Sequence, residues 1–242
     1  MLGFWGKIAE VGLYNAAYRV TGIPLIVMAL ISMGFYPALS KAFKESKEKL
    51  QKLWNYQMEI MIVLAMPIMA GGMLLASKII IFFYSSSYAP SIPVFKLLVL
   101  MAGINFLYTS YNMMLIVSNQ QKKHFWICLI TAVINIVLNF VLIPRYSFYG
   151  AGLSTLFSYI VLFVLEVEFS RRVTPITIFN LRLAKVLFAA VVSSIIMSLV
   201  LSQHLVYYSY NFAILFLIGA AVYLVALSLF YKLLRLYAYL IS

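Results

Sequence analysis

Seven long apolar runs constrain this sequence more than any other feature. Each is close to or longer than the roughly 20 residues that an α-helix needs to cross the hydrocarbon core of a bilayer. Transmembrane strands would be about half as long and would alternate polar with apolar residues, which these runs do not. Helices are therefore expected, because a helix satisfies its backbone hydrogen bonds within one segment. The predicted spans are residues 13–39, 57–75, 93–118, 124–143, 149–169, 182–202 and 211–231.

The composition argues against a water-soluble fold. Of the 242 residues, 65% are hydrophobic and only 10% are charged, whereas a soluble domain of this size needs a larger polar surface. The net charge is +12, but the basic residues lie mostly between apolar runs, so nucleic acid is not an expected partner. We predict an all-α, polytopic membrane helix bundle that forms a single transmembrane domain over residues 1–242.

Basic residues alternate along the connections between the predicted spans. The connections after the first, third and fifth spans and the segment after the seventh carry most of them, and the intervening connections carry few. Because basic connections stay preferentially in the cytoplasm, the pattern predicts a multi-pass protein of the cytoplasmic membrane. Its N-terminus would lie outside and its C-terminus inside. The basic residues on the predicted cytoplasmic side are Lys41, Lys44, Lys47, Lys49, Lys52, Lys122, Lys123, Arg171, Arg172, Arg182, Lys185, Lys232 and Arg235.

Two connections are long enough to need a structure of their own. Residues 41–56 are predicted to form an amphipathic helix on the inner leaflet, and a solvated charged loop is the alternative. Residues 76–92 contain three consecutive serines and Pro90, with Pro93 directly after them, and are predicted to form an outer loop. The apolar face of the amphipathic helix would consist of Phe43, Leu50, Leu53 and Trp54.

Motifs for enzymatic chemistry are almost absent from the sequence. It has no Walker loop, no HExxH and no GxSxG, and it contains no Asp. With Cys128 as the single cysteine, an intrachain disulfide is excluded and a cysteine-based metal cluster is not expected. We therefore predict a protein that is not an enzyme and uses no metal or cofactor. His124 is interpreted as a surface residue, and Glu168 is expected to pair with Arg172, four residues further on.

Arg19 is the charged residue placed deepest in a predicted span. A charge at the centre of a membrane helix costs at least about 2.5 kcal/mol on insertion scales, so Arg19 should face a cavity or a partner. Asn15 lies four residues earlier on the same face, and a guanidinium can chelate a phosphate through two hydrogen bonds. Arg19 and Asn15 are therefore candidate residues for binding an anionic lipid-linked substrate. The alternative is that Arg19 extends to the outer headgroups or pairs inside the bundle.

Two further pairs of asparagines lie on predicted spans, each pair on one helical face. Asn105 and Asn112 are seven residues apart, and Asn135 and Asn139 are four apart. Such amides commonly join neighbouring helices, and they can instead line a polar cavity that meets sugar hydroxyls. We keep all four as candidate substrate-binding residues.

Prolines within the first two spans provide sites where the helices can bend. Pro24, Pro37 and Pro67 each remove a backbone hydrogen bond, and Gly71 and Gly72 follow the last of them. These positions could be hinges of an alternating-access movement or static bends.

Three stretches of the sequence resemble a known family. They are VGLYNAAYRVTGIPLIVMALISMGFYPALSKAF (11–43), PIMAGGMLLASKIIIFFY (67–84) and INIVLNFVLIPRYSFYGAGLSTLFSY (134–159). Together they are similar to the polysaccharide flippases of the multidrug/oligosaccharidyl-lipid/polysaccharide exporter superfamily. The resemblance covers residues 11–170, and the spans within 181–242 resemble that family's C-terminal pair of helices. It implies the C-terminal half of such a protein, with the N-terminal lobe absent.

The resemblance implies a function for the candidate residues. Flippases of this family have two helical lobes around a central cavity and move polyprenyl-diphosphate-linked oligosaccharide across the cytoplasmic membrane for polysaccharide biosynthesis. The family's basic residue in a Y-x-x-A-Y-R-like stretch corresponds to Arg19. The implied partners are membrane lipids, the lipid-linked glycan and a separate chain that supplies the N-terminal lobe.

Three alternatives remain open from the sequence. A cation-coupled multidrug exporter of the same superfamily would be expected to place acidic residues in mid-membrane, and the glutamates here lie at span ends or outside the spans. A membrane-embedded transferase would need clustered His, Asp or Glu residues, which the sequence does not show. The last alternative is a non-transporting fragment or scaffold that assembles with a partner half.

Overall fold

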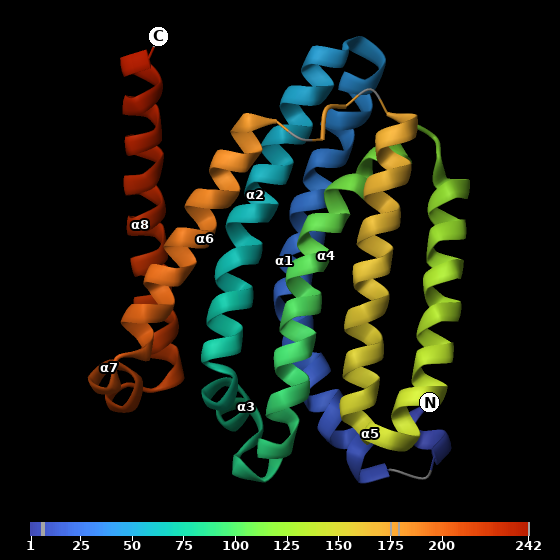
Figure 1. The fold of residues 1–242 in the computed structure, drawn as a ribbon, viewed down its shortest axis with the longest axis vertical. Helices are drawn as coiled ribbons and strands as arrows, with labels where there is room; N and C mark the ends of the chain where they lie inside the picture. The colour runs from blue at the N-terminus through green and yellow to red at the C-terminus, as the bar shows by residue number, and fades with distance from the viewer. Residues whose placement is uncertain (6–7, 175, 179, 242) are drawn as a thin grey trace.

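The protein is an elongated bundle of helices in a computed structural model that describes residues 1–5, 8–174, 176–178 and 180–241 (Figure 1). All regular secondary structure within these residues is helical, which confirms the predicted all-α class. The elements are η1 (Leu2–Trp5), α1 (Ile8–Glu45), α2 (Lys47–Leu74), α3 (Ala76–Tyr84), η2 (Ser86–Ser91), α4 (Ile92–Val117), α5 (Gln121–Val173), α6 (Leu181–Ser202), α7 (His204–Ser209) and α8 (Phe212–Ile241).

Six helical segments of the described chain are long and apolar enough to cross a membrane. One of them, α5, has 53 residues and reverses direction at Ser147, where φ is 55° and ψ is −136°. Figure 1 shows its two legs running side by side. Counting the two legs separately, seven segments of the described chain are long enough to cross a membrane, which agrees with the seven predicted spans. Pro144 and Ser147 lie in the reversal, which falls between the predicted fourth and fifth spans.

α4 is the central helix of the bundle and packs against α1, α2 and α5. Its side chains are mostly buried, whereas α1 is mostly exposed along its apolar length. Trp54 of α2 is fully buried and its indole Nε1 donates a hydrogen bond to the backbone oxygen of Ser110 on α4, at 3.1 Å. Burial of large apolar side chains between helices therefore fixes α2 against α4.

Glycines allow α2 and α4 to approach closely. A Cβ added at Gly72 would lie 2.7 Å from Cγ1 of Val99, and one at Gly103 would lie 2.2 Å from Met69. Small residues at helix contacts are typical of membrane bundles, where close van der Waals packing replaces the hydrophobic effect. Gly72, which follows Pro67, therefore has a packing role, and whether the proline serves as a hinge stays a prediction.

Residues 41–56 do not form the separate surface helix that the sequence predicts. α1 and α2 are both continuous helices here, and they meet in a tight turn at Ser46. The Ser46 side chain caps α2 by accepting a hydrogen bond from the backbone N–H of Lys49, at 3.1 Å. The prediction was wrong because the apolar face containing Leu50 and Trp54 packs inside the bundle, where both residues are buried.

Residues 76–92 are also more ordered than the predicted outer loop. They form α3, η2 and the start of α4. Ile79 and Ile80 are buried in the main core, so apolar packing stabilises a short helix in this connection. On the side of α3 toward α7, Lys78 lies over the ring of Tyr207, 4.9 Å from its centroid, and donates a hydrogen bond to the backbone oxygen of Tyr210.

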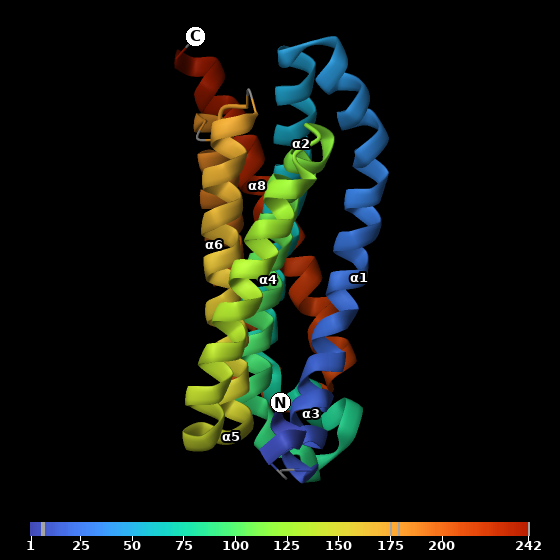
Figure 2. The same ribbon diagram turned by 90° about the vertical axis from the view of Figure 1, so that its right-hand side faces the viewer.

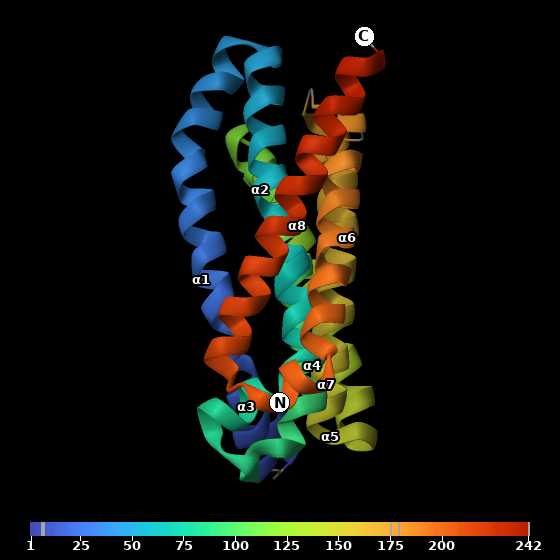
Figure 3. The same cartoon turned by 90° about the vertical axis from the view of Figure 1, so that its left-hand side faces the viewer.

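α6 and α8 form a pair attached to the outer side of α2. α8 crosses α6 obliquely in the view from that side (Figure 3). Tyr223 of α8 donates a hydrogen bond to the backbone oxygen of Val63 at 2.8 Å. Arg182, at the start of α6, pairs with Glu59 of α2, with its Nη2 2.9 Å from Oε2. These contacts fix the position of the last two spans.

The connections gather at two opposite ends of the bundle. The α1–α2, α4–α5 and α5–α6 connections share one end, here called the basic end, because it carries most of the Lys and Arg residues. α3, η2, the α5 reversal and α7 lie at the opposite end, near the N-terminus (Figures 1 and 2). The alternation of charge along the sequence therefore becomes a difference between the two ends of the structure.

Candidate functional site

A small hollow lies beside α1 toward the end opposite the basic end. Its volume is about 210 Å³. One wall is a face of α1 and the other is formed by tyrosines of α3 and η2. The lining residues are Gly12, Asn15, Ala16, Arg19, Tyr84 and Tyr88. The structure thus brings the predicted pair Asn15 and Arg19 into one hollow.

The hollow is held open by contacts on either side of it. Ser91 donates a hydrogen bond from its hydroxyl to the backbone oxygen of Leu13, at 2.8 Å, and so ties the start of α4 to α1. Tyr14, on the neighbouring face of α1, lies with its hydroxyl 3.1 Å from the Thr155 hydroxyl of α5. A Cβ added at Gly12 would meet nothing within 4 Å. Gly12 therefore leaves space where a larger side chain would protrude.

Arg19 is the chemically distinctive residue of this hollow. Its side chain is exposed, and within the part of the chain that the structure describes no ion pair or hydrogen bond engages its guanidinium. A guanidinium without a carboxylate partner presents its donors to a ligand in a planar fork that matches phosphate oxygens. The Asn15 amide beside it can add a donor or an acceptor. The arrangement can therefore bind a phosphate or another small anion.

A second polar group joins α4 to both legs of α5. The Nδ1 of His124 lies 2.5 Å from Oε1 of Glu166, and the side-chain amide nitrogen of Asn112 lies 2.7 Å from the same ring nitrogen. Cys128 Sγ lies 3.4 Å from the ring Nε2. Glu166 is fully buried. The interpretation of His124 as a surface residue is right only in part, because its side chain is 27% exposed and its ring turns inward to this carboxylate.

Asn135 joins the two legs of α5 to each other, and Asn139 bonds to Asn135 within the first leg. The Asn135 amide donates to the Ser158 hydroxyl at 3.1 Å, and the Asn139 amide donates to the Asn135 side-chain oxygen at 2.8 Å. The position of Asn135 fits an interhelical contact, one of the two roles considered for this pair.

The remaining predicted residue, Asn105, is buried on α4. Its backbone oxygen accepts a hydrogen bond from Thr109, at 2.8 Å. Among the described residues, no hydrogen bond connects Asn15 or Arg19 to the asparagines of α4 and α5. The six candidates thus fall into separate groups, and only Asn15 and Arg19 share a hollow.

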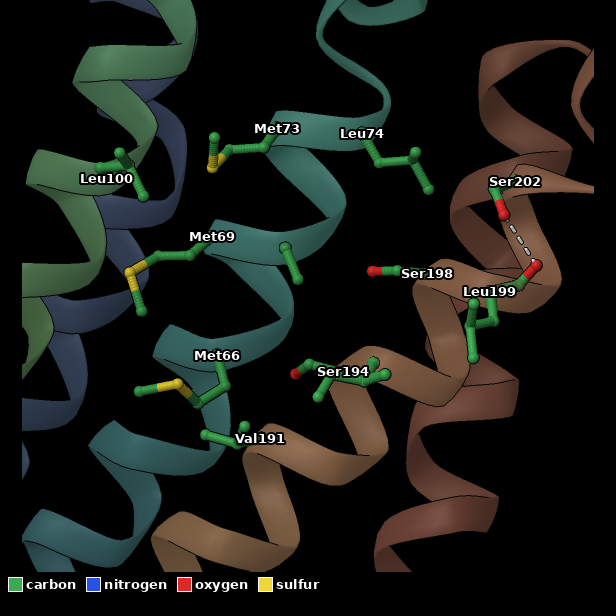
Figure 4. A pocket seen from close by; sticks show the side chains of 12 residues that line it. Met66, Met69, Met73, Leu74, Leu100, Val191, Ser194, Ser198, Leu199 and Ser202 are labelled. Carbon is green, nitrogen blue, oxygen red and sulfur yellow. Dashed lines mark hydrogen bonds between the residues drawn. The ribbon is translucent and has the colours of Figure 1, made fainter.

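A larger cleft lies between α2, α4 and α6 (Figure 4). Its volume is about 480 Å³. Methionines of α2, including Met66, Met69 and Met73, and the α6 serines Ser194, Ser198 and Ser202 line it. Ser202 uses its hydroxyl within α6, where it donates to the backbone oxygen of Leu199 at 2.9 Å. No charged side chain lines this cleft, so it provides no cation to pair with an anionic group.

Two groups of functional interest were not predicted from the sequence. Glu166 was treated as a residue of the inner span end, yet it continues a buried stripe of the second α5 leg at four-residue spacing. The burial of Glu166 could have been predicted from this four-residue spacing. Tyr84 and Tyr88 had no such signal, because their place in the hollow depends on how α3 packs against α1. The stripe consists of Gly150, Ser154, Ser158, Leu162, Glu166 and Ser170.

The predicted Glu168–Arg172 contact is confirmed at 2.6 Å.

Comparisons with known proteins find similarities in sequence and in fold. Residues 3–93 match the family model of a polysaccharide biosynthesis protein. Over 162 residues the chain is 26% identical to the probable flippase AglR of Haloferax volcanii, an alignment that covers 65% of this chain and 34% of that protein. The fold matches lipid II flippase MurJ in an inward closed conformation, with a TM-score of 0.73 and 19% identity, over 93% of this chain and 48% of that one.

The chain spans about a third of the length of AglR and about half the length of MurJ. The likeness in fold extends beyond residues 11–170, because it includes nearly the whole chain. Part of the sequence is thus similar to a polysaccharide biosynthesis family and to a probable flippase, and the fold is similar to that of MurJ.

Proposed function

We propose that this chain takes part in moving polyprenyl-diphosphate-linked oligosaccharide across the cytoplasmic membrane for polysaccharide biosynthesis. The observation that carries the proposal is Arg19, whose guanidinium lines a hollow without a carboxylate partner in the described chain. In this proposal Arg19 and Asn15 contact the diphosphate of the carrier. The relation to flippases supports a lipid-linked cargo, and the protein performs transport without chemical conversion of the cargo.

The proposed orientation places the basic end in the cytoplasm. The Lys and Arg residues of the connections gather there, and positive connections are retained on the cytoplasmic side. The hollow at Arg19 then lies toward the outer leaflet, where cargo arrives after translocation. The four asparagines of α4 and α5 are proposed to contribute to the route of the glycan.

A partner is part of the proposal, since the chain covers only part of its relatives' length. α1 exposes many large apolar side chains along its length, which are suited to lipid or to another helical bundle. We propose that a second set of helices, in another chain or in a longer form of this one, closes the translocation path beside α1. The protein would then work by alternating access, with the two sets of helices opening to each side in turn.

The proposal is tested by replacing Arg19 in cells that depend on this protein. Cells without the protein should accumulate lipid-linked saccharide on the inner leaflet and lose surface polysaccharide. Arg19→Ala should reproduce most of that defect at normal protein level, because losing a charge-assisted contact to phosphate costs about 1.5–3 kcal/mol, or roughly tenfold to a hundredfold in affinity. Lipid-linked saccharide is measured by extraction and surface polysaccharide by labelling. Normal surface polysaccharide in Arg19→Ala cells would remove this residue from the mechanism.

A cation-coupled multidrug exporter is a second candidate, and one structural observation favours it. Glu166 is a fully buried carboxylate in contact with His124, and ionisable residues buried within membrane bundles often mark ion pathways. Efflux of a cationic dye that depends on a sodium or proton gradient, and that Glu166→Gln abolishes, would support this candidate. Dye retention equal to that of cells without the protein would exclude it.

A further inference from the structure

Two tyrosines form the wall of the hollow opposite Arg19. Tyr84 ends α3 and Tyr88 lies in η2, and their ring centroids are 5.1 Å apart with the ring planes 36° from each other. Both line the same hollow as Arg19 and Asn15. An aromatic surface and a guanidinium therefore face one small space.

The tyrosine pair is held in place by the protein core. Both rings are half-buried and pack against the main hydrophobic cluster. Ser85, between α3 and η2, has a positive φ of 77° and hydrogen-bonds Ser87 through their hydroxyls, at 2.9 Å. A tight turn thus brings the two rings together. The rings are organised before any ligand arrives, which lowers the entropic cost of binding.

The two walls offer different chemistry to a ligand. The guanidinium of Arg19 provides several charge-assisted donors for a phosphate. A tyrosine ring provides an apolar face for the carbon–hydrogen face of a sugar, and its hydroxyl provides a hydrogen bond at the edge. The hollow, of about 210 Å³, is smaller than the roughly 300–1,000 Å³ of sites that enclose a drug-sized ligand. It can therefore hold a single sugar with its phosphate, and not a whole oligosaccharide.

We propose that Tyr84 and Tyr88 are sugar-binding residues, so that this hollow recognises a sugar phosphate and not phosphate alone. The inference rests on the proposed function, because it takes Arg19 as the phosphate contact. It adds that the first sugar of the lipid-linked glycan lies against the two tyrosines while its phosphate lies against Arg19. The remainder of the glycan then extends out of the hollow.

The test uses the purified full chain in detergent micelles and two soluble probes, glucose 1-phosphate and inorganic phosphate. Binding of each probe is measured by ligand-detected NMR titration. The native protein should bind glucose 1-phosphate about threefold to tenfold more tightly than phosphate, the contribution expected of one aromatic contact. Equal affinities for the two probes would overturn the proposal.

Variants at the two walls separate the contributions of sugar and phosphate. Tyr84→Leu and Tyr88→Leu should remove most of the preference for glucose 1-phosphate and leave phosphate binding unchanged. Tyr88→Phe should keep most of the preference, because it keeps the ring. Arg19→Gln should weaken the binding of both probes. As a matched control, Tyr36→Leu replaces an exposed tyrosine of α1 toward the basic end and should change neither. A preference that survives both leucine variants contradicts the sugar-binding role.

A steric variant shows whether the probes bind in this hollow. Gly12→Leu places a side chain where the structure has open space, and Gly34→Leu does so elsewhere on the same helix. Gly12→Leu should abolish binding of both probes, whereas Gly34→Leu should leave it intact. Glucose 1-phosphate binding that persists in Gly12→Leu would place the ligand elsewhere and overturn the inference.

The outcomes distinguish this inference from the proposed function. If Arg19→Gln abolishes phosphate binding but the tyrosine variants keep the sugar preference, the anion site remains and the tyrosine role fails. If the binding results are as expected but Arg19→Ala cells make normal surface polysaccharide, the hollow binds sugar phosphates and the transport role fails.

Discussion

At the scale of single residues, Gly150 decides how closely the two legs of α5 can meet. It follows the reversal at Ser147, and a Cβ added there would lie 2.4 Å from the backbone oxygen of Leu142. That distance is far below van der Waals contact, and a backbone atom cannot rotate away as a side chain can. The second leg therefore depends on glycine at this position.

We expect Gly150→Ala to destabilise the protein by roughly 1–3 kcal/mol, the usual cost of forcing an extra group into a packed site. Gly34→Ala is the matched control, because a Cβ at Gly34 meets open space and alanine favours helix. Thermal unfolding in detergent, followed by the loss of the monodisperse chromatographic peak, measures both. If the two variants unfold at the same temperature, the close approach described here does not exist.

Arg19 shows what single-residue reasoning can and cannot predict. A charged residue in an apolar run had to face something other than lipid, and the structure places it in a polar hollow. The tyrosines on the other wall were not predictable in the same way. Tyr84 and Tyr88 are separated from Arg19 by more than 60 residues, and only the packing of α3 brings them to α1.

At the scale of elements, the Asn112–His124–Glu166 group joins α4 to both legs of α5. The carboxylate of Glu166 is fully buried, while the side chain of His124 is 27% exposed. Leaving a buried hydrogen-bonding group without its partner costs more than replacing both partners with apolar groups of similar shape. The intact group is therefore expected to add little to the free energy of unfolding, whereas loss of one member should lower it strongly.

Removing one partner should cost more than removing both. His124→Leu leaves the buried Glu166 side chain without its imidazole partner and should destabilise the protein by about 1–3 kcal/mol. The double variant His124→Leu with Glu166→Leu should recover most of that loss, because two apolar side chains suit the surrounding membrane helices. Glu168→Gln, at an exposed ion pair, is the control and should have little effect.

The native protein, His124→Leu, Glu166→Leu and the double variant form a double-mutant cycle that measures the coupling between His124 and Glu166. The comparison uses thermal stability of the four proteins in the same detergent. Additive effects of the two single substitutions would contradict a direct contact.

The elements themselves were largely predictable, and their connections were not. The seven spans follow from hydrophobicity and length, and even the reversal of α5 is marked by Pro144 and its polar neighbours. The prediction of a separate surface helix for residues 41–56 failed because an amphipathic pattern fits either a helix on a membrane surface or a packed helix end. The buried Trp54, bonded to Ser110, decides between them, and that contact is a property of the assembled bundle.

At the scale of the whole molecule, the bundle has two chemically different ends. One carries the lysine- and arginine-rich connections, and the other carries the tyrosine-lined hollow with Arg19. If the basic end lies in the cytoplasm, the hollow opens toward the side on which a flipped saccharide is released. The proposed direction of transport therefore depends on this orientation.

Cysteine labelling in intact cells tests the orientation most directly. Cys128 is the only cysteine, so Cys128→Ala provides a background on which Lys47→Cys, at the basic end, and Ser86→Cys, in η2, are made separately. Both positions are exposed. A membrane-impermeant maleimide should label Ser86→Cys in intact cells and Lys47→Cys only after the membrane is opened. Labelling of Lys47→Cys in intact cells, with Ser86→Cys protected, would contradict the account.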